Sequence, residues 1–152
     1  MHRSANGHSR EDIVKQVKSG TDSSIYNWST YIPIGHSVEK LQKWKTRGAK
    51  ILYLTSRIKP WEVEEIKSVL KNHGFPDGKL LFRQKGEEYK DVAEKAMPDV
   101  LIEDDCESIG GREEMTITHV KPDLKKKIKS VVVKEFEGVN HLPDDLEKLR
   151  LM

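Results

Sequence analysis

The sequence predicts an α/β fold with a parallel sheet, and two observations carry this prediction. Short apolar runs suited to buried strands alternate, along residues 36–104, with segments whose apolar residues recur at helical spacing. The connections between these segments are short, which is typical of parallel sheets with right-handed crossovers. A chain of 152 residues accommodates one such domain, so we expect residues 1–152 to form a single α/β domain.

The composition argues against several classes of protein. Charged residues make up 34% of the chain, but the signs nearly cancel at a formal net charge of +2, whereas nucleic-acid-binding domains usually carry a strong basic excess. No apolar stretch approaches the length of a membrane span, and the polar start lacks the apolar region of a signal peptide. The single cysteine, Cys106, cannot form an internal disulfide, which fits a reducing compartment. We therefore expect a cytoplasmic protein that binds neither nucleic acid nor a membrane.

The amino-terminal third contains two expected helices and the first expected strand. Ser9 and Asp12 fit a helix-capping pattern, and the apolar residues that follow give a short helix one apolar face. Residues 36–47 show helical spacing, and Gly48 ends that helix. The apolar run that comes next predicts a strand over residues 49–54, and we expect its residues 51–54 to be mostly buried on both faces.

The middle of the chain continues the alternation. Pro60 suits the first turn of a helix that ends near Gly74. Residues 79–82 predict a strand, residues 87–97 a helix, and residues 100–102 another strand.

The pattern is weaker after residue 111. Residues 115–119 and 130–133 predict two strands, with a helix over residues 122–129 between them. A final short helix begins within residues 142–145. The tryptophans at positions 28, 44 and 61 are interpreted as packing residues of the core or of helices.

Polar side chains follow two of the expected strands. Thr55 and Ser56 come directly after the apolar run ILYL, and three acids, Glu103, Asp104 and Asp105, come directly after the run VLI. If both strands are parallel, these groups project from one edge of the sheet, where ligands bind in open α/β folds. Clustered carboxylates repel one another unless a cation offsets them, which suggests a hard-cation site for Mg²⁺. The alternative is a strand that runs into a solvated acidic turn.

Two lysines lie between these strand ends in the sequence. Lys85 precedes the helix expected over residues 87–97, and Lys90 lies within its first turns. An ammonium, a hydroxyl and a carboxylate pair on one rim can hold an anion together with a divalent cation.

These residues resemble the haloacid dehalogenase (HAD) superfamily, a group that consists mainly of phosphohydrolases. ILYLTSR is similar to the second motif of the family, which implies that Thr55 contacts phosphate, and the adjacent Ser56 and Arg57 are candidate substrate-binding residues. For Arg57, a surface ion pair is the alternative. VLIEDD is similar to the fourth motif, in which an acidic pair helps to bind Mg²⁺.

Within the fourth motif, Glu103 and Asp104 are the pair in register, and Asp105 is the alternative for one position. The third motif of the family is a lone lysine, for which Lys90 has the better spacing and Lys85 is the alternative. The stretch PIGHSVEKLQKWKTRGAK resembles the helix that precedes the second motif. The resemblance implies a three-layer, Rossmann-like parallel sheet.

One feature of the family is missing from the sequence. Its nucleophile is an aspartate of an Asp-x-Asp motif at the end of the first strand, and no Asp-x-Asp occurs here. Asp12 and Asp22 do not follow apolar strands. We therefore expect this first strand to be missing and the domain to be truncated at its amino end, with residues 1–152 alone inactive and weak in Mg²⁺ binding.

The missing strand has a structural consequence. In the family it lies between the strands expected at residues 49–54 and 100–102, so each of these would lose a partner, and unpaired buried backbone groups cost about 1–3 kcal/mol each. A missing amino-terminal piece is the favoured explanation; the alternatives are that another segment fills the gap or that the two strands pair with each other.

The resemblance implies a Mg²⁺-dependent phosphatase that hydrolyses a small phosphorylated metabolite through an aspartyl-phosphate intermediate in the full-length protein. The site is either open or covered by residues 25–34 or by a partner subunit, as in a homo-oligomer. Two alternatives remain. The first is a non-catalytic HAD-like binding or regulatory domain that has lost the nucleophile. The second is an unrelated Rossmann-like binding module.

Overall fold

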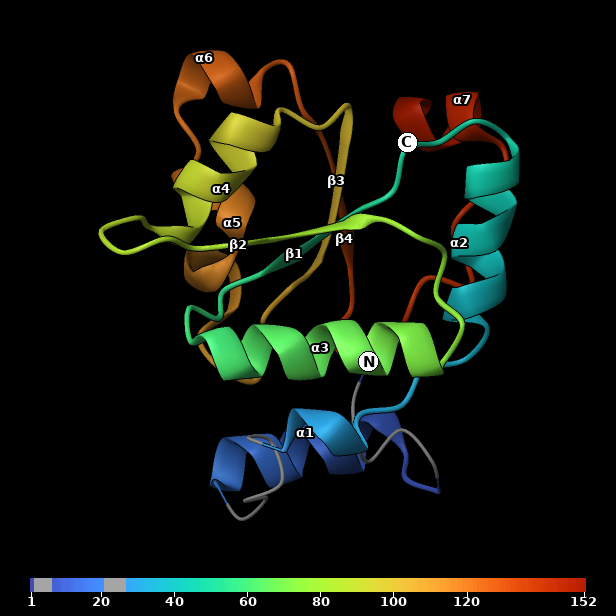
Figure 1. Ribbon diagram of the computed structural model, residues 1–152, viewed down its shortest axis with the longest axis vertical. Helices are drawn as coiled ribbons and strands as arrows, with labels where there is room; N and C mark the ends of the chain where they lie inside the picture. The colour runs from blue at the N-terminus through green and yellow to red at the C-terminus, as the bar shows by residue number, and fades with distance from the viewer. Residues whose placement is uncertain (2–6, 21–26) are drawn as a thin grey trace.

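The computed structural model describes residue 1, residues 7–20 and residues 27–152, and shows a mixed α/β architecture with short parallel strands (Figure 1). Strand β1 (Leu52–Thr55) pairs in parallel with β2 (Lys79–Phe82), and β3 (Val100–Asp104) pairs in parallel with β4 (Lys129–Val133). These pairs form two separate two-stranded sheets. The predicted α/β class with parallel strands is confirmed, but the single sheet is replaced by two small ones.

The described helices connect and flank the strands. They are α1 (Arg10–Ser19), α2 (Ser37–Thr46), α3 (Pro60–Asn72), α4 (Tyr89–Ala96), α5 (Thr116–His119), α6 (Pro122–Lys125) and α7 (Leu146–Leu151), with 3₁₀ turns η3 (Trp28–Thr30) and η4 (Gly111–Glu114). None of them has the length and apolar character that crossing a bilayer requires.

Local sequence signals explain where α1 and α4 begin. The Ser9 hydroxyl accepts a hydrogen bond from the Asp12 backbone N–H at 3.2 Å, which confirms the predicted cap of α1. Helix α4 begins with a capping box, in which the Glu88 backbone N–H donates to the Asp91 carboxylate at 2.8 Å. This cap fixes the residue after Glu88, Tyr89, which lines the candidate site described below.

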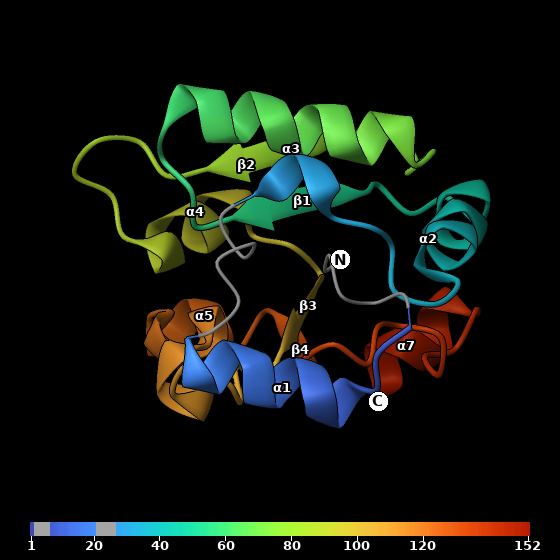
Figure 2. The same ribbon diagram turned by 90° about the horizontal axis from the view of Figure 1, so that it is seen from below.

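Two apolar clusters cover opposite faces of the β3–β4 pair. Leu101 packs with residues of α4 and α5 in one cluster, whereas Val131 and Val133 pack with Trp44 of α2 and with α7 in the other. Figures 1 and 2 show the same arrangement, with α4, α5 and α6 on one side of the strands and α2 and α7 on the other. Helices on both faces explain why β3 contains a continuous apolar run. In β4 the burial alternates, because Val131 and Val133 are buried whereas Val132 is 49% exposed.

Strand β1 contributes to both clusters without pairing with β3. Leu54 packs against the cluster on the α4 side, and Ile51, just before β1, packs against the cluster on the α2 side. Within the described residues β1 pairs with β2 alone and β3 with β4 alone. Direct pairing of β1 with β3, one of the alternatives for the missing strand, is therefore wrong for this part of the chain.

The strand expected at residues 115–119 is wrong, because this segment contains helix α5. Met115, Thr116 and Ile117 are buried in succession, which a strand with one solvated face would not allow. The Glu103 carboxylate accepts hydrogen bonds from the backbone N–H groups of Thr116 and Ile117 at 2.7 and 3.0 Å, and these bonds hold the first turn of the helix. A residue distant in the sequence, Glu103, therefore stabilises the helical structure of this segment.

The burial expected for residues 51–54 is only partly reached. All four residues of β1 are half-buried, so this strand is less enclosed than its apolar sequence predicts. The remaining predicted strands, at residues 79–82, 100–102 and 130–133, correspond to β2, β3 and β4.

Candidate functional site

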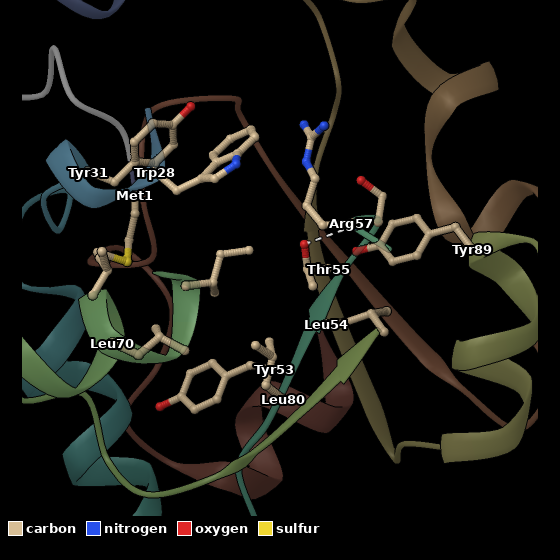
Figure 3. Close-up of a pocket in the computed structure, with 13 residues that line it drawn as sticks. Met1, Trp28, Tyr31, Tyr53, Leu54, Thr55, Arg57, Leu70, Leu80 and Tyr89 are labelled. Carbon is tan, nitrogen blue, oxygen red and sulfur yellow. Dashed lines mark hydrogen bonds between the residues drawn. The ribbon is translucent and has the colours of Figure 1, made fainter. Parts of the chain in front are cut away.

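A cavity of about 370 Å³ opens beside the carboxyl end of β1, between this strand, α3 and η3 (Figure 3). Its apolar wall includes Tyr53 and Leu54 of β1, Leu70 of α3 and Leu80 of β2. Its polar wall is the short segment Thr55, Ser56 and Arg57, three residues that the sequence analysis singled out. The sequence-predicted strand end therefore lies at a real cavity.

Hydrogen bonds fix the segment after β1. The Thr55 hydroxyl accepts a hydrogen bond from the Arg57 backbone N–H at 3.3 Å, drawn as a dashed line in Figure 3. The Ser56 carbonyl accepts a hydrogen bond from Nε of Arg83 at 2.8 Å. Because these contacts use one acceptor of Thr55 and the backbone of Ser56, the Thr55 hydroxyl proton remains available as a donor.

Two hydrogen-bond donors that line this cavity have no acceptor among the described residues. The guanidinium carbon of Arg57 lies 4.2 Å from the centroid of the Trp28 ring, and within the described residues Arg57 forms no ion pair. Trp28 is 8% exposed, and its Nε1 is buried without a hydrogen-bond partner in the described part of the chain. The surface ion pair considered for Arg57 is therefore not formed with any described carboxylate.

Tyr89, at the start of α4, connects this cavity to the acids at the end of β3. It lines the cavity opposite Trp28, as Figure 3 shows. Burial raises the pKa of the Tyr89 hydroxyl well above its usual range, and the negative charges of Glu103 and Asp104 raise it further. Met1 also lines the cavity, and its amino group experiences the charge of Asp104. The ends of β1 and β3 thus share neighbours although the strands are not paired.

The three acids expected to bind metal are engaged in backbone hydrogen bonds. Both carboxylate oxygens of Glu103 accept from the start of α5, as described above. One Asp104 oxygen, Oδ1, accepts from the Cys106 backbone N–H at 2.9 Å. The Oδ1 atom of Asp105 accepts from the backbone N–H groups of Glu107 at 3.3 Å and Glu135 at 3.1 Å. These hydrogen bonds stabilise the loops after β3, so the three carboxylates are not all free to bind a metal ion.

Glu135 is a fourth acid at this edge, which the sequence analysis missed. It follows β4 and is 8% exposed, and its carboxylate accepts hydrogen bonds from the Ser108 hydroxyl and backbone N–H, both at 2.7 Å. Burial raises the pKa of Glu135, and the charges of Asp104 and Asp105 add to this effect. The run VVVKE resembles VLIED in placing an acid at the end of an apolar strand, so the same rule would have found Glu135.

The acids do not form a metal cage. Within residues 7–20 and 27–152, no group of three or more His, Cys, Asp or Glu side chains is arranged to hold a metal ion. Asp104 and Asp105 each have one carboxylate oxygen, Oδ2, with no described backbone donor. Of these two, Asp104 is the residue whose charge acts on Tyr89 at the cavity, so it is the better placed to offer a ligand to Mg²⁺ near that cavity.

The two candidate lysines lie outside the cavity wall. Lys90 forms an ion pair with Glu88 at 2.5 Å, which raises the pKa of its ammonium group. Lys85 is exposed in the loop before α4. The structure therefore brings Thr55, Ser56 and Arg57 together and does not place either lysine beside them.

Cys106 and the segment of residues 25–34 are neighbours of the site. Burial, with added contributions from Asp104, raises the pKa of the Cys106 thiol to about 12, which makes this cysteine a poor nucleophile near neutral pH. Of residues 25–34, expected to cover the site, the described part contains η3 and lies against α3, so Trp28 and Tyr31 form one cavity wall. Positions 25 and 26, like Asp22, lie outside the described residues.

Comparisons with known proteins found no matching family model, no matching curated protein and no matching solved structure.

Proposed function

We propose that the protein binds a small phosphorylated metabolite at the end of β1 and belongs to the Mg²⁺-dependent phosphohydrolases of the HAD type, with a three-layer Rossmann-like domain. The observation that supports this proposal best is the position of Tyr89, which neighbours both the Thr55 strand end and the Asp104 strand end. A hydroxyl and a guanidinium line the cavity, and the Asp104 carboxylate lies beyond Tyr89, which lines the same cavity. Together these groups match the needs of a phosphate ester with its metal ion.

In this proposal each residue has a defined role. The Thr55 hydroxyl donates a hydrogen bond to a phosphate oxygen, and Arg57, which has no described ion-pair partner, supplies the charge that offsets the phosphate. The Asp104 carboxylate is the residue that would hold Mg²⁺, because Mg²⁺ in phosphate sites is commonly bound by one or two carboxylates. The bound ion would offset the negative charge of the phosphate. Glu103 and Asp105 position the loops around Asp104.

Phosphate binding is the first test, since it does not depend on the nucleophile. Titration calorimetry with phenyl phosphate should detect binding to residues 1–152, and Thr55→Val should weaken it about tenfold by removing one donor to a charged oxygen. Addition of Mg²⁺ should strengthen binding, and this gain should disappear in Asp104→Asn. Asp123→Asn, at an exposed position of α6, is the matched control and should change neither value.

The second test concerns turnover. We expect residues 1–152 to show no hydrolysis of p-nitrophenyl phosphate above background. If the gene encodes an upstream strand with Asp-x-Asp, a chain extended by that strand should show Mg²⁺-dependent activity that Asp104→Asn abolishes. Lys90→Ala in the extended chain tests the lysine, which must leave Glu88 to reach the phosphate. Absence of binding to any phosphate ester would refute the proposal at its first step.

A non-catalytic binding domain is the second candidate, and one observation favours it. Both carboxylate oxygens of Glu103 and Oδ1 of Asp105 accept hydrogen bonds from backbone N–H groups, a role in the fold that requires no metal ion. Phosphate-ester binding that Mg²⁺ does not strengthen, with no turnover from the extended chain, would identify this candidate.

A further inference from the structure

We infer that the cavity beside β1 selects phosphate monoesters whose organic part is an aromatic ring, with Trp28 and the apolar wall determining this specificity and Arg57 binding the phosphate group. The inference deepens the proposed function and rests on it, because Thr55 and Arg57 are shared with the phosphate site. It adds a ring-binding subsite and a second polar contact, which phosphate binding alone does not require.

The shape and lining of the cavity carry the first step. Its volume of about 370 Å³ is far larger than one phosphate group needs, and falls in the range of small-molecule pockets, about 300–1,000 Å³. Apart from the polar segment Thr55, Ser56 and Arg57, the described part of the wall consists of aromatic and aliphatic residues, among them Tyr53, Leu70 and Leu80 (Figure 3). An aromatic ring gains by leaving water for such a wall, whereas a sugar with many hydroxyl groups would leave them unpaired there.

The indole nitrogen of Trp28 carries the second step. A buried N–H without an acceptor is rare in folded proteins, and it points to an absent acceptor when the group lines a cavity. Figure 3 shows Arg57 reaching past Thr55 towards the Trp28 ring. A ligand oxygen near the edge of this pair can accept from Trp28 Nε1 while another oxygen of the same ester faces the Arg57 guanidinium, so both donors would be satisfied by one anionic ligand.

The indole resonances provide a direct readout. The chain has three tryptophans, and a ¹H–¹⁵N spectrum therefore contains three indole N–H signals. Trp44 donates to the Pro143 carbonyl at 2.9 Å and Trp61 is 53% exposed, so both are internal controls. Trp28→Phe identifies the third signal by its disappearance and keeps an aromatic ring in place.

The titration uses four probes with the full chain of residues 1–152: phenyl phosphate, n-butyl phosphate, inorganic phosphate and phenol. We expect phenyl phosphate to shift the Trp28 signal in a saturable manner, to leave the two control signals in place, and to bind at least tenfold more tightly than the other three probes. Trp28→Phe should weaken phenyl phosphate binding about fivefold, as expected for one lost hydrogen bond. Arg57→Gln should weaken phenyl phosphate and inorganic phosphate by a similar factor.

A cavity-filling change separates the ring subsite from the phosphate site. Leu70→Phe places a larger side chain in the apolar wall and should reduce phenyl phosphate binding about tenfold while leaving the affinity for inorganic phosphate unchanged. Circular dichroism and the control signals report whether each variant is folded. Lys71→Ala, at an exposed neighbouring position of α3, is the matched control.

The outcomes distinguish this inference from the proposed function. Equal affinities for phenyl phosphate and inorganic phosphate would overturn the ring subsite and leave the phosphate site standing. Phenol binding as tightly as phenyl phosphate would overturn the role of the anion. Failure of every phosphate-containing probe to bind would overturn both the inference and the proposed function.

Discussion

Replacement of Glu103 by alanine tests whether this acid serves the fold or a metal ion. In the wild-type chain its two carboxylate oxygens accept backbone hydrogen bonds from Thr116 at 2.7 Å and Ile117 at 3.0 Å. Thr116 and Ile117 are 4% and 7% exposed, so water cannot easily replace the lost acceptors. Leaving a buried donor unsatisfied costs about 1–3 kcal/mol, and removing a helix cap typically about 1 kcal/mol.

We expect Glu103→Ala to lower the free energy of unfolding by about 2–4 kcal/mol, because two buried donors lose one shared acceptor group. With a urea slope of about 2 kcal/mol/M, the midpoint of urea unfolding should fall by about 1–2 M. Glu103→Gln keeps one acceptor oxygen, so its urea midpoint should lie between those of Glu103→Ala and the wild type. Glu113→Ala, at an exposed position of η4, is the control and should leave the midpoint unchanged.

A midpoint for Glu103→Ala within about 0.3 M of the wild type would refute this reasoning. It would mean that water satisfies the start of α5 and that the carboxylate is free for another role. If the same variant also abolished the effect of Mg²⁺ on phosphate-ester binding, Glu103 would be assigned as a ligand of the metal ion.

Three further predictions concern other regions. At pH 8 a thiol reagent should react with Cys106 at least about 100-fold more slowly in the folded than in the urea-unfolded chain, since the folded pKa of about 12 exceeds the usual value of about 8.5. The same shift should make stability fall as the pH rises from about 8.5 to about 12, and Cys106→Ala should remove this part of the fall. Trp44→Phe removes the hydrogen bond to the Pro143 carbonyl at a site 4% exposed and should cost about 1–2 kcal/mol in urea unfolding, whereas Trp61→Phe should cost nothing measurable. The ion pairs with Lys40 and Lys43 lower the pKa of Asp144, so its stabilising contribution should be lost as the pH falls below about 4, and melting temperatures of Asp144→Asn should depend less on pH in that range.

Much of the local structure could be predicted because its causes lie within a few residues. Strand β2 has the predicted bounds, and the cap of α1 uses the predicted serine. Helix α3 begins at the predicted Pro60. In each case the apolar pattern and the residue that begins or ends the element lie within a few residues of each other in the sequence.

The failures have long-range causes. Residues 115–119 carry β-branched side chains in a strand-like pattern, but the carboxylate that holds their first turn belongs to Glu103. The division into two sheets could not be predicted from the sequence either, because the pairing of strands depends on where each strand lies in the fold and not on its own sequence.

For the candidate site, the strand-end rule found Thr55, Ser56 and Arg57 because they are consecutive in the sequence. The same rule could not reveal that the acids after β3 bind backbone N–H groups. Trp28 and Tyr89 come from other elements and reach the cavity only through tertiary packing, so no local pattern distinguishes them from ordinary core residues.

The half-buried state of β1 has a consequence for how ligand binding is coupled to local unfolding. β1 contains no buried residue, whereas β3 and β4 contribute Leu101, Val131 and Val133 to the two apolar clusters. Amide hydrogens of β1 and β2 should therefore exchange with solvent through smaller openings than those of β3 and β4. A ligand held at the end of β1 binds the closed form alone, so it should slow exchange in β1 and β2 more than elsewhere. Part of the binding free energy would then be spent in closing the weaker of the two sheets, and the affinity of the site would depend on the stability of that sheet.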